Sequence, residues 1–196
     1  MSLQDQTLQS FMIFGGVDEN QKVGEFYEHD VETEKWWGLR MSVIQYDKDE
    51  VSNYMMNQKN VTALIDTGSS LILLPKFEYN GVMDRIKQDL KKHNETLYCE
   101  GGLCWAQQTC KIMKDMIGNL SFTIDDTIYT LKPMAYLFEG ALLDRDLVGS
   151  CMIGINALPK TAPDDVMLLG ITFLRNFYTV FNMEENSVKL AINVNS

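Results

Sequence analysis

Long apolar runs and basic residues are both scarce in this sequence. No stretch approaches the ~18 apolar residues of a membrane-spanning helix, and the polar opening MSLQDQTLQS lacks the apolar segment of a signal peptide. Lys and Arg number 17 against 27 Asp and Glu, so the net charge is −10 and the isoelectric point is about 4.6. Such a surface repels phosphate backbones and anionic lipids. We therefore expect no membrane span and no nucleic-acid partner.

Histidine is rarer still, with only His29 and His93, both far from any cysteine. A zinc site needs tighter paired spacings of cysteine, usually with histidine, and the acidic run 47–50 lacks the glycine punctuation of a calcium loop. The segment TGSSL lacks the glycine that follows the serine in a nucleophile elbow. We expect no metal, no cofactor and no serine triad.

The cysteine count is low but even, which fits two disulfides with three connectivities open. Three Asn-X-Ser/Thr sequons accompany the cysteines, and each is a weak signal by itself. Together they favour an oxidising, secretory-type compartment, extracellular or lysosomal/vacuolar. Four reduced cysteines in the core are the alternative. The residues concerned are Cys99, Cys104, Cys110 and Cys151, and the candidate glycosylation sites Asn60, Asn94 and Asn119.

Short strand-like runs dominate the 196 residues, which suit one buried core. In the run 36–46, Leu39, Met41 and Val43 alternate onto one face. One clear helix follows Pro75, with apolar residues at helical spacing up to Leu90. Many strands with few helices predict an all-β domain. The expected strands are 11–16, 24–31, 36–46, 61–66, 71–74, 120–124, 128–131, 151–155, 166–170, 177–182 and 187–192, with single helical turns at 133–136 and 172–175.

One acidic residue occupies an unusual place. In TALIDTGSSLILLP (62–75), Asp66 lies on a tight turn between two apolar runs typical of buried strands. Burial raises a carboxyl pKa and nearby hydrogen-bond donors lower it, and Thr67, Gly68 and Ser69 are such donors. An Asp-Thr-Gly tripeptide alone occurs by chance, but this setting suits an acid/base carboxyl better than a surface turn.

Four stretches, in order, resemble the C-terminal lobe of a pepsin-like aspartic endopeptidase. FMIFGGVD (11–18) resembles the segment that opens that lobe, and ALIDTGSSLILLP (63–75) resembles its catalytic loop. GSCMIGI (149–155) resembles the segment with the second cysteine of its disulfide, and LLGITFLRNFYTVFNMEENSVKLA (168–191) resembles the C-terminal signature. The resemblance covers nearly all of the chain from about residue 10.

The resemblance implies a fold and a set of roles. We expect a bent or closed, barrel-like β-sheet lobe with one or two short helices, over residues 10–196. Residues 1–9 would be a flexible segment or an artificial start within a longer precursor. Asp66 would be a catalytic aspartate, with Thr67, Gly68 and Ser69 supporting the catalytic loop. Leu168, Leu169 and Gly170 would pack against that loop, and the disulfides would be Cys110–Cys151 and Cys99–Cys104.

The sequence differs from the family pattern at two positions and lacks the second catalytic aspartate. The family often has an acidic residue where this chain has Ile171, and its loop is more often Asp-Thr-Gly-Thr than the version with Ser69. Two aspartates share a proton around one water in the family's reaction, but this chain has one Asp-Thr-Gly. The resemblance therefore implies a missing N-terminal lobe as partner and a peptide or protein substrate.

Several functions remain open on the sequence. We expect the chain by itself to be inactive and to self-associate through surface that the missing lobe would cover. A homodimer could instead assemble the catalytic pair from two copies of Asp66. The whole protein could also be a non-catalytic relative that binds peptides or another ligand, or the domain could be an unrelated β-rich interaction module.

Overall fold

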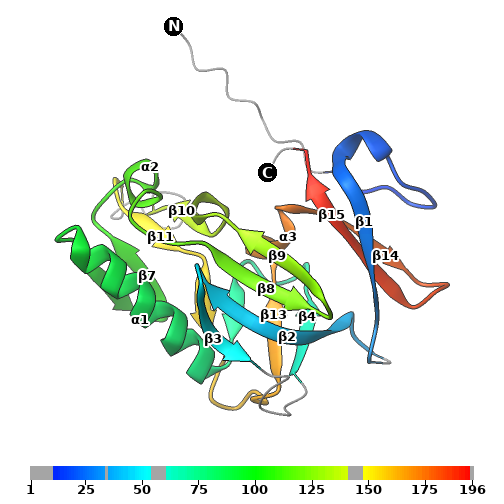
Figure 1. Ribbon diagram of the computed structural model, residues 1–196, viewed down its shortest axis with the longest axis horizontal. Coiled ribbons are helices and arrows are strands. Elements are labelled where there is room, and N and C mark those ends of the chain that lie inside the picture. The colour runs from blue at the N-terminus through cyan, green and yellow to red at the C-terminus, as the bar shows by residue number, and fades with distance from the viewer. Residues whose placement is uncertain (1–10, 34, 54–60, 141–147, 195–196) are drawn as a thin grey trace, which may run out of the picture.

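The computed structural model describes residues 11–33, 35–53, 61–140 and 148–194, and it is built mostly of strands (Figure 1). The prediction of an all-β lobe is confirmed. The strands are β1 (Lys22–Asp30), β2 (Gly38–Tyr46), β3 (Asp49–Asn53), β4 (Val61–Ile65), β5 (Ile72–Leu74), β6 (Leu97–Glu100), β7 (Leu103–Ala106), β8 (Leu120–Ile124), β9 (Thr127–Leu131), β10 (Leu137–Glu139), β11 (Cys151–Ile153), β12 (Ile155–Ala157), β13 (Val166–Leu169), β14 (Phe177–Asn182) and β15 (Ser187–Asn193). The helices are α1 (Lys76–Lys92), α2 (Cys110–Met113) and α3 (Ile171–Leu174), with 3-10 turns η1 (Glu19–Gln21) and η2 (Pro133–Ala135).

The strands form three sheets. The largest has the order β12-β5-β13-β4-β2-β8-β9, with β3 also paired to β2. In the described residues its end strands do not pair with each other, so the sheet is open rather than closed. A second sheet has the order β10-β11-β7-β6, and a third has the order β1-β15-β14. Figure 1 shows the third sheet on the opposite side of the molecule from α1.

Strand β2 departs from the simple alternation expected for it. Leu39 and Met41 are buried, but Val43 is only half-buried, and the buried positions continue at Ile44 and Tyr46. The pairing of β2 with β8 shifts register between Met41 and Val43, so Ser42 is the extra residue of a β-bulge. A bulge reverses the alternation beyond it. The prediction that Val43 shares a face with Leu39 and Met41 is therefore wrong.

The expected strand at 11–16 is also wrong, because the structure places no regular element there. The side chains of residues 11–14 are exposed, and Phe14 is 87% exposed. The ring of Phe11 lies 6.0 Å from the ring of Tyr178 on β14. An apolar run therefore lies along the third sheet without forming a strand. Strands β3, β6, β7, β10 and β12 and helix α2 were not expected from the sequence. The single strand expected at 151–155 is wrong as well, because β11 ends at Ile153 and β12 belongs to a different sheet.

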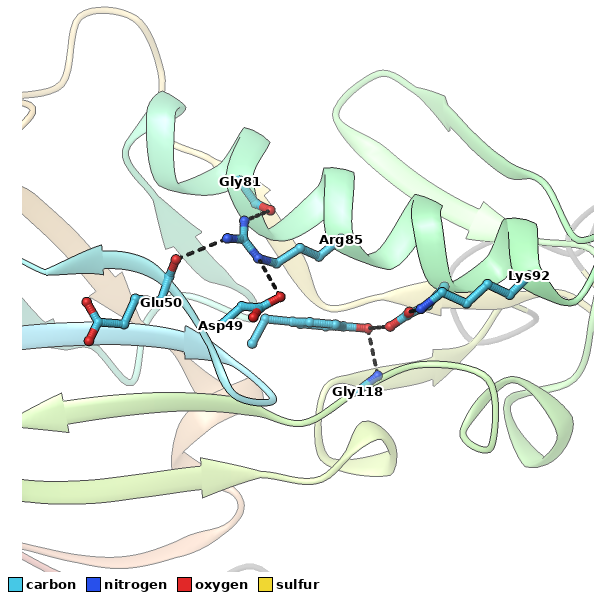
Figure 2. Close-up of polar contacts among 8 residues, drawn as sticks. Asp49, Glu50, Gly81, Arg85, Lys92 and Gly118 are labelled. Atoms are coloured by element: carbon cyan, nitrogen blue, oxygen red, sulfur yellow. Dashed lines mark hydrogen bonds and ion pairs between the residues drawn. The ribbon is translucent and has the colours of Figure 1, made fainter.

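Helix α1 follows Pro75 as predicted, and Val82, Met83, Ile86 and Leu90 form its buried face. Polar contacts fasten the helix to the strands below it (Figure 2). The Arg85 guanidinium donates to the carbonyl oxygens of Gly81 and Glu50, each at 3.0 Å.

A second polar group fastens the other end of α1. The Tyr46 hydroxyl donates to Asp89 Oδ2 at 2.8 Å and accepts the Gly118 N–H at 2.6 Å. Asp89 also pairs with Lys92 at 2.6 Å (Figure 2). Burial raises the pKa of the Tyr46 hydroxyl, so the phenol stays protonated and joins α1, β2 and the loop before β8.

Two disulfides connect the remaining elements. Cys99 pairs with Cys104 across the β6–β7 hairpin, and Cys110 pairs with Cys151 between α2 and β11. These are the pairs that the resemblance implied. Cys104, Cys110 and Cys151 are buried in the core, whereas Cys99 is exposed on the edge strand β6.

Candidate active site

The candidate active site is the turn between β4 and β5. The two strands are not neighbours, because β13 lies between them, parallel to β4 and antiparallel to β5. The turn must therefore cross the carboxyl end of β13. This crossing places Asp66 beside the end of β13, where Asp66 N–H donates to the Leu169 carbonyl oxygen at 3.2 Å.

The Asp66 carboxylate is held by its own turn. The Gly68 N–H donates to Oδ1 at 2.9 Å, and the Ser69 hydroxyl donates to Oδ2 at 2.5 Å. Within the described part of the chain, these are the hydrogen bonds that the carboxylate receives. Hydrogen bonds to an ionised carboxylate are about twice as strong as neutral ones. One oxygen is therefore fixed by main chain and the other by a hydroxyl, and the side chain is half-buried.

The far side of the turn is held by the start of α3. The Ile171 N–H donates to the Ser69 carbonyl oxygen at 2.8 Å. The Thr172 N–H and hydroxyl both donate to the Ser70 carbonyl oxygen, at 3.0 and 2.8 Å. A side chain on Gly170 would place its Cβ 2.3 Å from the Ser69 oxygen, so only glycine permits this approach. The turn is thus anchored from both sides.

The structure brings most of the expected site residues together. Leu168 pairs with Leu64 of β4 and Leu73 of β5, and Leu169 is buried beside Ile65 and Ile72. Thr67 is different, since its side chain is exposed and its hydroxyl has no hydrogen bond in the described ranges.

Sequence reasoning missed Thr172. This side chain is fully buried and its hydroxyl donates to the Ser70 carbonyl oxygen, but the resemblance to the C-terminal signature assigns roles only to Leu168, Leu169 and Gly170. No local pattern in the sequence indicates the contact, because Ser70 and Thr172 are 102 residues apart.

The remaining expected features lie away from this turn. Asn94 and Asn119 are exposed, and Asn60 lies outside the described residues. Over those described residues, no group of three His, Cys, Asp or Glu side chains could hold a metal ion. In the same part of the chain, no helix combines the length and the apolar character that crossing a membrane would require.

The comparisons with known proteins show the family to which this all-β lobe belongs. The family model for eukaryotic aspartyl proteases matches residues 1–193, and the chain belongs to this family. It is similar to Pepsin A of Gallus gallus, with 28% identity over 93% of the chain and 43% of that protein. Cathepsin E of Mus musculus is 29% identical over 93% of the chain and 41% of its own length. Gastricsin of Mus musculus is 25% identical over 93% and 42%. The chain thus spans less than half the length of these relatives.

Proposed function

We propose that this chain is the C-terminal lobe of a two-lobed aspartic endopeptidase and supplies one of its two catalytic carboxylates, Asp66. Residues 10–196 form that lobe, and residues 1–9 precede it. The observation that carries the proposal is the Asp66 carboxylate, fixed by Gly68 and Ser69 on a turn anchored by Gly170, in a chain of the aspartyl protease family.

The proposed reaction needs a second carboxylate opposite Asp66. Two carboxyl groups a few ångströms apart cannot both ionise easily, so one proton is shared between them. The ionised group takes a proton from a bound water, and the protonated group polarises the scissile carbonyl of the peptide. The reaction uses no metal, no cofactor and no covalent intermediate with the enzyme. Gly68 and Ser69 keep Asp66 oriented through both steps.

The second carboxylate would come from the N-terminal lobe of the full protein. The exposed Thr67 hydroxyl suits a contact that locks the two catalytic loops together across the lobe interface. The third sheet supports the same partner. An exposed apolar strip accompanies it, formed by Phe11, Met12, Ile13, Phe14, Val17, Val23, Tyr27, Ile192 and Val194. Apolar surface of this kind marks an interaction site.

We assign the protein to an oxidising compartment, either extracellular or lysosomal/vacuolar. Two disulfides in the structure support this assignment, because disulfides persist in such environments and are rare in the cytosol. The substrate is an unfolded peptide or protein segment that reaches the cleft between the lobes. Glycosylation of the protein in that compartment belongs to the same proposal.

The decisive experiment measures peptidase activity on an unstructured protein from about pH 3 to 7. The full-length precursor and the present chain are each assayed as wild type, as Asp66→Asn and as Asp126→Asn, an exposed aspartate that serves as the matched control. We expect activity in the processed precursor, loss with Asp66→Asn, no change with Asp126→Asn, and none in the chain alone.

Two other outcomes would replace the proposal. Activity in the isolated chain that is lost with Asp66→Asn would mean that two copies assemble the catalytic pair. Inactivity of a folded, processed precursor would indicate a relative that binds peptides without cleaving them.

A further inference from the structure

Two sequons lie within the described residues, and the fold treats them differently. Asn94-Glu95-Thr96 follows the end of α1, in the connection to β6. Asn119-Leu120-Ser121 runs from a turn into β8. The Tyr46 hydroxyl is hydrogen-bonded to Asp89 of α1 and to Gly118. Asn94 follows the end of α1, and Asn119 follows Gly118 directly.

The Asn94 sequon is accessible to a glycosyl transferase in the folded protein. Its φ of 58° is left-handed, a conformation that asparagine tolerates better than most residues and that often ends a helix. Its N–H donates to the Lys91 carbonyl oxygen at 3.1 Å, which fixes the main chain of the turn. Its side-chain amide makes no hydrogen bond in the described part of the chain, and both Asn94 and Thr96 are exposed. The amide nitrogen and the sequon hydroxyl are therefore both reachable in the folded protein.

Folding makes the Asn119 sequon inaccessible to a glycosyl transferase. Its N–H donates to Asp47 Oδ1 at 2.7 Å, and its carbonyl oxygen accepts the Asp47 N–H at 2.8 Å. Ser121 is only 7% exposed, and its hydroxyl is hydrogen-bonded to Thr130 Oγ1 at 2.9 Å within the β8–β9 hairpin. A transferase could use this sequon only before β8 pairs.

We propose that Asn94 carries an N-linked glycan and that Asn119 remains unmodified. The proposal rests on the proposed function, because it requires the secretory compartment. In the transfer, the Asn94 amide nitrogen bonds to the anomeric carbon of a lipid-pyrophosphate-linked oligosaccharide. The bond from that carbon to the phosphate oxygen breaks, the lipid pyrophosphate leaves, and the amide loses one proton to a base.

The position of the glycan agrees with the proposed assembly. Helix α1 lies on the opposite side of the molecule from β1, β14 and β15 (Figure 1). A glycan at the end of α1 leaves the exposed apolar strip on that sheet free for the second lobe. It adds polar bulk beside the exposed β6 edge strand, whose unpaired backbone is otherwise open to association.

The test translates the full-length precursor with microsomes of the endoplasmic reticulum, in a background of Asn60→Gln that removes the third sequon. The variants are Asn94→Gln, Thr96→Val, Thr96→Ser and Asn119→Gln, with Asn80→Gln as a matched control on an exposed asparagine outside any sequon. Protease protection reports entry into the microsomes, and glycosidase treatment reports the glycan on a gel.

We expect a glycosidase-sensitive shift in the background chain. Asn94→Gln and Thr96→Val should each reduce this shift by one glycan, whereas Thr96→Ser, Asn119→Gln and Asn80→Gln should leave it unchanged. A protected chain without a glycan, or one whose glycan is lost with Asn119→Gln, overturns the inference and leaves the proposed protease function intact. A chain that never becomes protected overturns the compartment assignment and the glycan together.

Discussion

The main chain of Gly170 passes so close to Ser69 that a Cβ atom on Gly170 would lie 2.3 Å from the Ser69 carbonyl oxygen. The same atom would lie 2.4 Å from the Leu71 carbonyl oxygen. Both neighbours are backbone, so neither can rotate away as a side chain could. The end of β13 and the catalytic turn are thereby held at a separation that any other residue would enlarge.

Gly170→Ala should therefore damage the site through packing alone. We expect a loss of unfolding free energy of about 3 kcal/mol and a larger loss of peptidase activity in the processed precursor. Gly16→Ala is the control, because a Cβ at Gly16 meets no atom within 4 Å. Denaturant unfolding followed by circular dichroism measures the difference. Equal stability of the two variants would contradict the close approach.

Ser69→Ala removes the hydroxyl that donates to Asp66 Oδ2 at 2.5 Å. A hydrogen bond to a charged group contributes about 1.5–3 kcal/mol, so kcat/KM of the precursor should fall about 10- to 100-fold. Ser69→Thr keeps the hydroxyl and should retain most of the activity. Steady-state kinetics on one peptide compare the three proteins. Full activity in the alanine variant would show that the turn orients Asp66 without Ser69.

His29 joins two sheets from a position that is 2% exposed. Its Nδ1 lies 2.7 Å from Asp125 Oδ2, and its Nε2 lies 2.6 Å from the Tyr129 hydroxyl. Burial raises the pKa of Tyr129, so the phenol that shares this hydrogen bond with Nε2 is neutral. His29→Leu leaves this hydroxyl buried without a partner, and we expect a loss of about 2–3 kcal/mol.

A double-mutant cycle separates this cost from packing. Adding Tyr129→Phe to His29→Leu removes the orphaned hydroxyl, and it should recover about 1 kcal/mol of the lost stability. Urea unfolding of the wild type, both single variants and the double variant gives the coupling. Strictly additive effects would mean that the contact between the imidazole and the phenol contributes nothing.

The stability of the third sheet should depend on pH through Glu28. The Ser187 hydroxyl, with Lys189 next, lowers the pKa of Glu28 below its ordinary value. A carboxyl whose pKa is lower in the folded state stabilises the protein above its unfolded pKa, and this contribution is lost as the pH falls through the folded pKa. Glu28→Gln should thus be less stable than wild type near neutrality, and the gap should close toward pH 3.

Thermal unfolding at pH steps between about 7 and 3 checks this expectation for Glu28. Glu25→Gln, on the same strand, is the control, because Glu25 is exposed and makes no ion pair in the described ranges. A gap between wild type and Glu28→Gln that stays constant with pH would rule out the carboxylate as its source.

The present chain without the rest of the protein should self-associate through the exposed apolar strip. Phe14, which is 87% exposed, is the most exposed member of that strip. Phe14→Glu should therefore lower the sedimentation coefficient at high concentration. Phe77→Glu is the control, because Phe77 is 75% exposed on α1, away from the third sheet. A wild-type chain that stays monomeric at high concentration would contradict the expectation.

Local patterns along the chain were enough to predict the class of the fold and to identify the candidate carboxylate. Alternating and apolar runs are local properties, so they indicated β2, β4, β5, β8, β9 and α1 near their observed bounds. Asp66 could be found because its turn residues and the apolar runs around it are contiguous along the chain. Strands β6 and β7 of the second sheet could not be predicted, since their sequences are short and carry little periodicity.

The contacts that hold the turn join segments far apart in the sequence, so local patterns could not predict them. The insertion of β13 between β4 and β5 brings Gly170 and Thr172 against Ser69 and Ser70, about a hundred residues earlier in the chain. The bulge at Ser42 and the burial of His29 have the same origin. Each depends on a residue from a strand that is distant in the sequence. Local patterns identify strand-forming residues, but they do not specify which strands become neighbours in a sheet.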